Sequence, residues 1–314
     1  MIEIDRLTKR YGQHTVVDDL SFSCAPGEVL GFLGPNGAGK STTMKMVTGF
    51  VAPNSGSAVV CGHDIADDAL AARKRLGYLP EGAPCYAEMT PMSFLTFIAD
   101  IRELTGSKRQ SRLDDVISKL HLGPVLKQTI DTLSKGFKRR VGLAQAILHD
   151  PDVLILDEPT DGLDPNQKHE VRELIHSMAT DKLIVISTHM LEEVEAVCSR
   201  AIIISDGRIL ADDTPQNLAT RSRYHNAVRL TLSPDNNLDE VQAAVEQLAS
   251  VETTESNREH MTVTAIAKQD SADAETWRQV NQIVGEKGWK VSGLQLETGR
   301  LDEVFRQITG GVQA

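Results

Sequence analysis

Residues 34–41 read Gly34-Pro35-Asn36-Gly37-Ala38-Gly39-Lys40-Ser41, which fits the pattern G-x-x-x-x-G-K-[ST]. Residues 28–33 before this stretch predict a strand, and the residues up to about Thr48 predict a helix. In this context the glycines let backbone N–H groups converge on phosphate oxygens, and the helix N-terminus adds partial positive charge. Lys40 would reach the β- and γ-phosphates of a nucleotide, and Ser41 would offer an oxygen to Mg²⁺. The stretch therefore predicts a phosphate-binding loop.

Two neighbouring acids, Asp157 and Glu158, end an apolar strand predicted over residues 153–156. Burying an ionised carboxylate at the end of a strand costs free energy unless the carboxylate binds a partner such as a cation. In enzymes with such a phosphate-binding loop, the first acid holds Mg²⁺ through its waters, and the next can orient or deprotonate the attacking water. Without the loop at 34–41, the pair would be interpreted as a strand end that leads into a turn.

His189 follows another apolar strand, predicted over residues 183–187. It would emerge at the same sheet edge as the two acids and could donate a hydrogen bond to a γ-phosphate. A lone histidine at such a position is more often structural. The presence of the loop and the acids favours the functional interpretation.

Strand and helix patterns divide the first 220 residues into three regions. Residues 1–33 alternate apolar and polar side chains in short bursts and predict a small β layer. Residues 88–149 change to helical spacing, rich in Leu, Lys and Arg, and predict a helical insertion. From residue 153 onward strands alternate with helices, one of them opened by Asp164-Pro165. This alternation predicts an α/β fold whose mostly parallel sheet is covered on both faces.

A polar stretch near residues 212–226 precedes a second region, 227–314. There the patterns predict strands at 227–232, 251–255, 261–267 and 291–296, with helices at 238–248, 274–285 and 301–308. The order is strand, helix, strand, strand, helix, strand and a final helix, which is consistent with a small α+β ferredoxin-like unit. The predicted domains are therefore 1–220 and 227–314.

The composition excludes several classes of protein. The 314 residues are 40% hydrophobic and carry a net charge of −11, which is typical of a globular chain and argues against non-specific nucleic-acid binding. The longest apolar runs are strand-sized, far short of the roughly 18 residues that span a bilayer. The N-terminus lacks the basic start and long apolar core of a signal peptide. We therefore expect no nucleic-acid partner, no membrane span and a cytoplasmic location.

Further motifs follow the loop in a fixed order. They are Leu133-Ser134-Lys135-Gly136-Phe137, Asp157-Glu158, Gly162-Leu163-Asp164 and Thr188-His189. With the loop, this ordered set resembles the ATP-binding cassette of ABC transporters over residues 1–220. The resemblance implies that ATP and Mg²⁺ are the cofactors, that ATP is hydrolysed, and that two copies pair head to tail as a homodimer. Each ATP would then lie between one loop and the opposite signature motif, residues 133–137, in which Ser134 can cap the helix that follows.

The resemblance also implies roles for individual residues. ATP contacts are expected from Tyr11, Gly34, Pro35, Asn36, Gly37, Ala38, Gly39, Lys40, Ser41, Thr42, Ser134, Gly136 and Asp164. The expected Mg²⁺ ligands are Ser41, Asp157 and Glu81, and the expected catalytic residues are Glu158, His189, Lys40 and Glu81. Tyr11 matches the aromatic residue that stacks on adenine in this family, although a tyrosine after a strand can equally be a packing residue. Asp164, besides capping a helix, matches the loop that touches the partner cassette.

Two positions depart from the family's general pattern. Lys135 and Phe137 replace a glycine and the glutamine of the usual L-S-G-G-Q signature, and Glu81 stands where the family commonly has a glutamine. Glu81 still provides a hard oxygen suited to Mg²⁺. With these departures and the segment at residues 301–305, the sequence resembles the ATPase subunits of ABC-2-type exporters.

This resemblance implies an exporter subunit that drives a separate membrane permease, bound peripherally on the cytoplasmic face of the membrane. Two alternatives remain at this point. One is a soluble ABC ATPase that acts on ribosomes or DNA. The other is an importer ATPase whose residues 227–314 form a regulatory domain.

Overall fold

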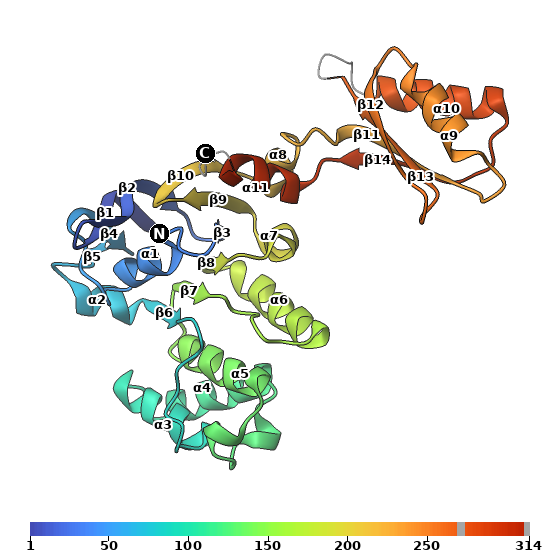
Figure 1. The fold of residues 1–314 in the computed structure, drawn as a ribbon. Coiled ribbons are helices and arrows are strands. Elements are labelled where there is room, and N and C mark those ends of the chain that lie inside the picture. The colour runs from blue at the N-terminus through green and yellow to red at the C-terminus, as the bar shows by residue number, and fades with distance from the viewer. Residues whose placement is uncertain (269–273, 311–314) are drawn as a thin grey trace. The chain divides into compact units, whose positions relative to one another are not determined.

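Two compact units make up the chain in a computed structural model that describes residues 1–268 and 274–310 (Figure 1). The first unit is Met1–Thr214 and the second is Pro215–Ala314. The division falls inside the polar stretch at 212–226, before residue 227. The short helix α8 (Pro215–Ala219) belongs to the second unit because it packs against the last helix, α11 (Leu301–Gly310).

A six-stranded mixed sheet forms the centre of the first unit, in the order β10-β9-β3-β8-β7-β6. Its strands are β3 (Val29–Leu33), β6 (Leu76–Leu79), β7 (Val153–Asp157), β8 (Leu183–Thr188), β9 (Arg200–Ser205) and β10 (Arg208–Asp213). Neighbouring strands are parallel except for β9 and β10. Every residue of β3, β7 and β8 is buried, as the middle of a sheet covered on both faces requires. These three strands lead into α1 (Lys40–Val47), α6 (Pro165–Ala179) and α7 (Leu191–Val197), respectively.

A four-stranded antiparallel sheet forms a second layer, in the order β2-β1-β4-β5. Its strands are β1 (Ile2–Tyr11), β2 (His14–Cys24), β4 (Ser55–Val60) and β5 (His63–Asp64), and α2 (Ala69–Lys74) leads on to β6. The expectation that residues 1–33 form one β layer is wrong for β3, which lies in the central sheet. The reason is that β3 is buried on both faces, whereas β1 and β2 include exposed positions along their length.

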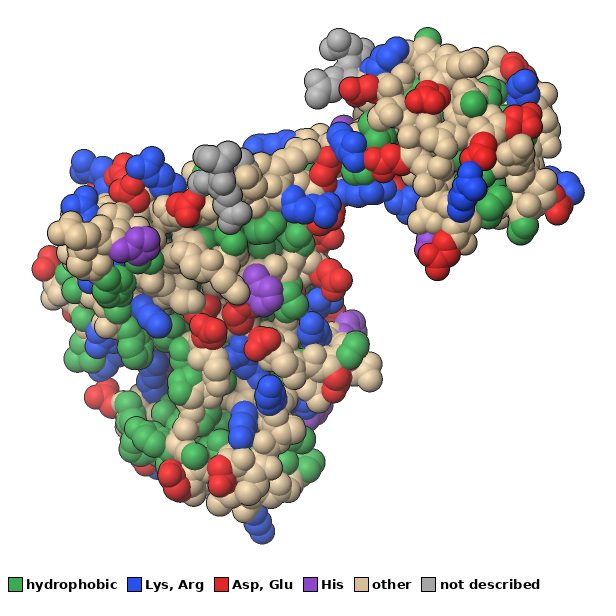
Figure 2. All heavy atoms as spheres, viewed as in Figure 1, with side chains coloured by type: hydrophobic (Ala, Val, Ile, Leu, Met, Phe, Trp, Pro, Cys, Tyr) green, Lys and Arg blue, Asp and Glu red, His purple; other side chains and the backbone are tan. Residues whose placement is uncertain are grey.

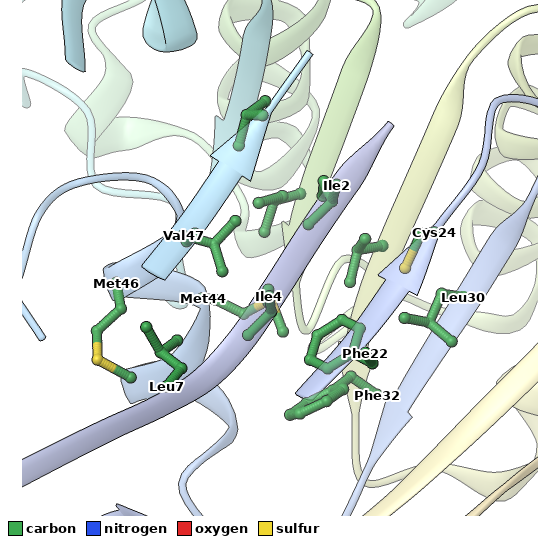
Figure 3. Close-up of a cluster of buried hydrophobic side chains, with 14 of the residues drawn as sticks. Ile2, Ile4, Leu7, Phe22, Cys24, Leu30, Phe32, Met44, Met46 and Val47 are labelled. Atoms are coloured by element: carbon green, nitrogen blue, oxygen red, sulfur yellow. The ribbon is translucent and has the colours of Figure 1, made fainter. Parts of the chain in front are cut away.

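The core of the first unit lies where the antiparallel layer and α1 meet the central sheet (Figure 3). Phe22 from β2 and Phe32 from β3 pack with their ring centroids 5.6 Å apart. Met44 and Met46 of α1 are buried in the same cluster, and burying such a side chain fully contributes about 2 kcal/mol. This packing fixes the body of the helix whose first residue is Lys40.

Three helices occupy residues 88–149: α3 (Pro91–Ile101), α4 (Gly106–Lys119) and α5 (Lys135–Ile147). Short 3₁₀ turns lie between the last two, η1 (Gly123–Val125) and η2 (Ile130–Thr132). Thr90 caps α3, because its Oγ1 accepts a hydrogen bond from the Ser93 backbone N–H at 3.2 Å, and Pro91 occupies the first helical position. Within the described residues, no helix combines the length and the hydropathy needed to cross a membrane.

The second unit pairs one antiparallel sheet with two helices on a shared apolar core. The strands are β11 (His225–Leu232), β12 (Val251–Asn257), β13 (Thr262–Ala267) and β14 (Val291–Thr298), in the order β12-β13-β11-β14. The helices α9 (Leu238–Glu246) and α10 (Glu275–Lys287) contribute Val241 and Val280 to the core beneath Val228 and Leu230. The element order and the sheet order are those of a ferredoxin-like unit, as predicted.

Candidate functional site

The phosphate-binding loop joins β3 to α1, and its backbone geometry depends on glycine. Gly39 directly precedes α1 and has a φ of 102°, a conformation that other residues rarely adopt. A Cβ atom built on Gly39 would also lie only 2.6 Å from the backbone oxygen of Val16 in β2. The loop can therefore approach β2 closely. The first backbone N–H groups of α1 have no partner within the helix, as at any helix N-terminus, and such groups can bind an anion.

Lys40 is 7% exposed, and its ammonium group is held by the loop itself. Its Nζ donates hydrogen bonds to the backbone oxygens of Gly34 at 2.7 Å and Pro35 at 3.1 Å. Burial lowers the pKa of Lys40, while the carboxylates of Glu158, Asp157 and Glu81 act in the opposite direction. This cation therefore faces three acids across the space beside the loop.

A pocket of about 280 Å³ opens beside the loop. It is lined by Val16, Asn36, Gly37, Gly39, Lys40, Ser41, Thr42, Glu81 and Glu158. The structure therefore gathers most of the loop residues expected from the sequence with one acid from the turn after β6 and one from the end of β7. Val16 was not predicted, since nothing in its sequence context distinguishes it from other residues of a half-buried strand.

Asp157 ends β7 and is fully buried. Neither oxygen of its carboxylate has a hydrogen-bond partner among the described residues. A buried carboxylate without a partner is costly, and a divalent cation would compensate it. Carboxylate and hydroxyl oxygens are the ligands that Mg²⁺ prefers. Ser41 and Glu81 line the loop pocket, whereas Asp157 directly precedes a lining residue, Glu158, without being part of the lining itself. The chemistry of these three donors fits Mg²⁺.

Glu158 and His189 meet at the carboxyl edge of the central sheet. Strands β7 and β8 pair in register from Val153 with Leu183 to Asp157 with Ser187, which brings the two following loops together. The Glu158 Oε1 lies 2.9 Å from Nδ1 of His189. The Glu158 side chain is 12% exposed, whereas that of His189 is 51% exposed, so the ring is accessible from solvent.

Glu158 also has an unusual backbone conformation, with a φ of 51°. A non-glycine residue in this region carries strain, which persists only where the surroundings hold it. Its backbone N–H donates to the backbone oxygen of Ser187 at 2.9 Å, which ties it to β8.

The signature motif begins α5, away from the pocket of its own chain. Ser134 caps α5, and its Oγ accepts a hydrogen bond from the Phe137 backbone N–H at 3.3 Å. Gly136 lies so close to Gln167 of α6 that a Cβ atom would overlap the Gln167 Oε1. Asp164 caps α6, and its Oδ1 accepts from the Gln167 backbone N–H at 2.9 Å.

Tyr11 is another expected ATP contact that is not part of the pocket lining. It ends β1 and is 51% exposed, with Nζ of Lys9 5.2 Å from the ring centroid. Among the residues that the structure describes, the lining of the loop pocket contains neither Tyr11 nor Ser134, Gly136 and Asp164. These four residues thus lie outside the pocket lining within a single chain.

Comparisons with known proteins agree with this geometry. A family profile described as "ABC transporter" matches residues 17–161. The chain is 40% identical over 218 residues to the Nod factor export ATP-binding protein I of Paraburkholderia xenovorans, covering 69% of this chain and 72% of that protein. It is 32% identical to the linearmycin resistance ATP-binding protein LnrL of Bacillus subtilis, covering 99% of this chain and 98% of that protein. The chain belongs to the ABC transporter ATP-binding proteins.

A solved structure described as the ATP binding subunit of an ABC transporter supports the same assignment. It superposes with a TM-score of 0.66 at 31% identity, covering 70% of this chain and 92% of that one. This ABC protein therefore binds and hydrolyses ATP. The P-loop α/β fold and the family predicted from the sequence are confirmed.

Proposed function

We propose that this ABC ATPase works as a head-to-tail homodimer that drives a separate membrane permease for export. One observation carries the dimer: the pocket combines the P-loop with Glu158, whereas Ser134 and Gly136 lie outside its lining within the described chain. A second copy would bring its signature motif over the ATP and supply backbone N–H groups at the start of α5. Tyr11 would stack on adenine, and Asp164 would contact the partner. The word "export" in the name of one relative supports the direction of transport.

Mg²⁺ would be held by Ser41, Asp157 and Glu81, beside the phosphates that the P-loop binds. When bound, the ion neutralises negative charge on the β- and γ-phosphates. Lys40 would exchange its two backbone acceptors for phosphate oxygens, which make stronger, charge-assisted hydrogen bonds.

Glu158 would act as the general base. Its Oε2 is buried and has no hydrogen-bond partner within the described residues, so it can accept a proton from a water molecule. The water oxygen then bonds to the γ-phosphorus, and the bond from that phosphorus to the β–γ bridging oxygen breaks with its electrons leaving on ADP. With both ring nitrogens protonated, His189 would donate from Nδ1 to Glu158 and from Nε2 to the γ-phosphate.

An apolar groove of about 550 Å³ supports the association with a permease. Phe50, Leu70 and Ile101 line it and are 73%, 69% and 59% exposed. Figure 2 shows hydrophobic side chains gathered on the face that carries α3. Charged side chains, among them Arg73, Lys74 and Glu103, also line the groove. Exposed apolar side chains gathered beside charged ones are typical of a protein interaction site. We assign it to a cytoplasmic segment of the permease.

The Glu158→Gln variant tests the catalytic assignment. The amide cannot accept the proton from water, but the P-loop is unchanged, so the variant should bind ATP, hydrolyse it at least about a hundredfold more slowly and accumulate as a dimer. Size-exclusion chromatography with Mg-ATP and a phosphate-release assay measure both effects. Hydrolysis at the wild-type rate would remove Glu158 from the role of base.

Co-purification of the full chain tests the association with a permease. Solubilised membranes should yield a membrane protein bound in stoichiometric amount. Recovery of the chain on ribosomes or DNA, without a membrane protein, would contradict the proposal and favour a soluble ABC ATPase.

A further inference from the structure

We propose that Arg139 is a positioning residue for ATP hydrolysis, which holds Glu158 of its own chain in the reactive conformation. The inference rests on the proposed role of Glu158 as general base. Arg139 lies in α5, five residues after the signature serine. It is 5% exposed, so its guanidinium group is buried beneath the carboxyl end of β7.

The guanidinium group brackets Glu158 on both sides. Its Nη2 donates to the backbone oxygen of Asp157 at 3.2 Å, and its Nε donates to the backbone oxygen of Pro159 at 3.3 Å. The residue between these two acceptors, Glu158, is the one whose φ is 51°. A strained backbone persists only where neighbouring contacts over-determine it, and these two hydrogen bonds supply that restraint. A planar group with fixed donors on one edge is suited to hold two acceptors at once.

The positive charge of Arg139 is a second feature that links it to the loop containing Glu158. Burial lowers the pKa of its guanidinium, while four carboxylates, those of Asp161, Glu158, Asp157 and Glu193, act in the opposite direction. Asp157 and Glu193 are themselves buried. The guanidinium remains charged even in such surroundings, so it compensates buried negative charge beneath the site. Lys40 also faces Asp157 and Glu158, from within the pocket.

The next residue of the helix provides a matched control. Arg140 pairs with Glu170 at 2.7 Å and lies over the ring of Phe137 at 5.6 Å, and neither contact involves β7. Arg139→Lys keeps the charge but loses the planar pair of donors, and Arg139→Gln keeps a neutral donor alone. Arg140→Gln removes a cation from the same helix without touching the Glu158 loop.

Steady-state kinetics of the full-length variants test the proposal. A backbone displaced by a fraction of an ångström at the base should slow chemistry and leave ATP binding in place. We expect Arg139→Gln to lower kcat by about 10- to 100-fold with KM within about threefold of wild type, and Arg139→Lys to recover part of the loss. Arg140→Gln should change kcat by less than about threefold. The proposal would be overturned if Arg139→Gln and Arg140→Gln lowered kcat equally. It would also be overturned if Arg139→Gln changed only KM.

Mixed dimers decide whether Arg139 acts within its own chain. In a mixture of Ser134→Arg and Glu158→Gln proteins, the one functional site uses Glu158 of the first protein and the signature of the second. Adding Arg139→Gln to the protein that keeps Glu158 should lower the rate at least about tenfold more than adding it to the protein that keeps Ser134. Equal losses, or the reverse order, would overturn the proposal.

The same mixture separates this inference from the proposed function. If the mixture is inactive with Arg139 intact, the head-to-tail arrangement is wrong. The comparison of kcat and KM in the unmixed variants would then still decide the role of Arg139. Thermal melting of each variant checks that it folds. If Arg139→Gln does not fold, Arg139→Lys replaces it in the kinetic comparison.

Discussion

Gly39→Ala should damage the ATP site far more than Gly37→Ala, although both glycines lie in the P-loop. Gly39 and Gly37 have φ values of 102° and 83°, so alanine is strained at either position by about 1–2 kcal/mol. Only at Gly39 does the new Cβ meet an obstacle, the backbone oxygen of Val16 at 2.6 Å, whereas nothing lies within 4 Å of a Cβ at Gly37. The two variants therefore separate backbone strain from collision.

The size of the effect follows from this geometry. An ordinary contact begins near 3.4 Å, which exceeds 2.6 Å by about 0.8 Å, so the start of α1 or β2 must move by that amount. A misplacement of about 1 Å in an active site can lower the reaction rate roughly a hundredfold. We expect Gly39→Ala to weaken ATP binding at least about tenfold more than Gly37→Ala.

Isothermal titration calorimetry with Mg-ATP measures the two affinities, and thermal melting without nucleotide confirms that both variants fold. If Gly39→Ala binds ATP within about threefold of Gly37→Ala, the collision with Val16 does not control the loop and the reasoning fails.

Two further predictions concern Glu81 and His149. Glu81→Gln should retain turnover within about tenfold of wild type, because an amide oxygen can also serve as a hard ligand; a phosphate-release rate a hundredfold lower would show that the acid itself is required. For His149, burial, and then the charge of Arg102, lowers the pKa from 6.5 to about 4. The unfolded chain therefore binds the proton first as pH falls, and stability present above pH 6.5 is lost between about pH 6.5 and 4. Urea unfolding measures the free energy of unfolding at pH 7 and pH 5. Between these two values the wild type should lose up to about 2 kcal/mol more of it than His149→Gln. Equal losses would show that His149 does not cause the pH dependence.

Local patterns predicted much of the fold. Ser134 and Asp164 were expected to cap helices, and both side chains accept hydrogen bonds from backbone N–H groups of the helices that follow. The seven elements after residue 224 appear in the predicted order, with bounds displaced by a few residues. These features depend on side-chain periodicity and on capping within a few residues, so the sequence records them directly.

The prediction that β3 belongs to the first β layer was wrong because pairing between strands is not a local property. Its residues could be recognised as a strand, but the sheet that a strand joins depends on partners elsewhere in the chain. Strand β3 pairs with β8 and β9, more than 150 residues later, and not with β1 or β2.

By itself, the sequence determined that this protein has a phosphate-binding loop, an acidic strand end and a histidine in the order of an ABC cassette, because each motif needs only neighbouring residues and a strand or helix beside it. The sequence predicted that His189 and the two acids share one sheet edge, but only the tertiary structure showed the direct contact between Glu158 and His189. It also showed that Arg139 donates hydrogen bonds to the backbone oxygens on either side of Glu158. Those contacts depend on which strands pair and on how α5 packs against the central sheet, where it contacts β6. The packing of distant segments leaves no local pattern from which it could be predicted.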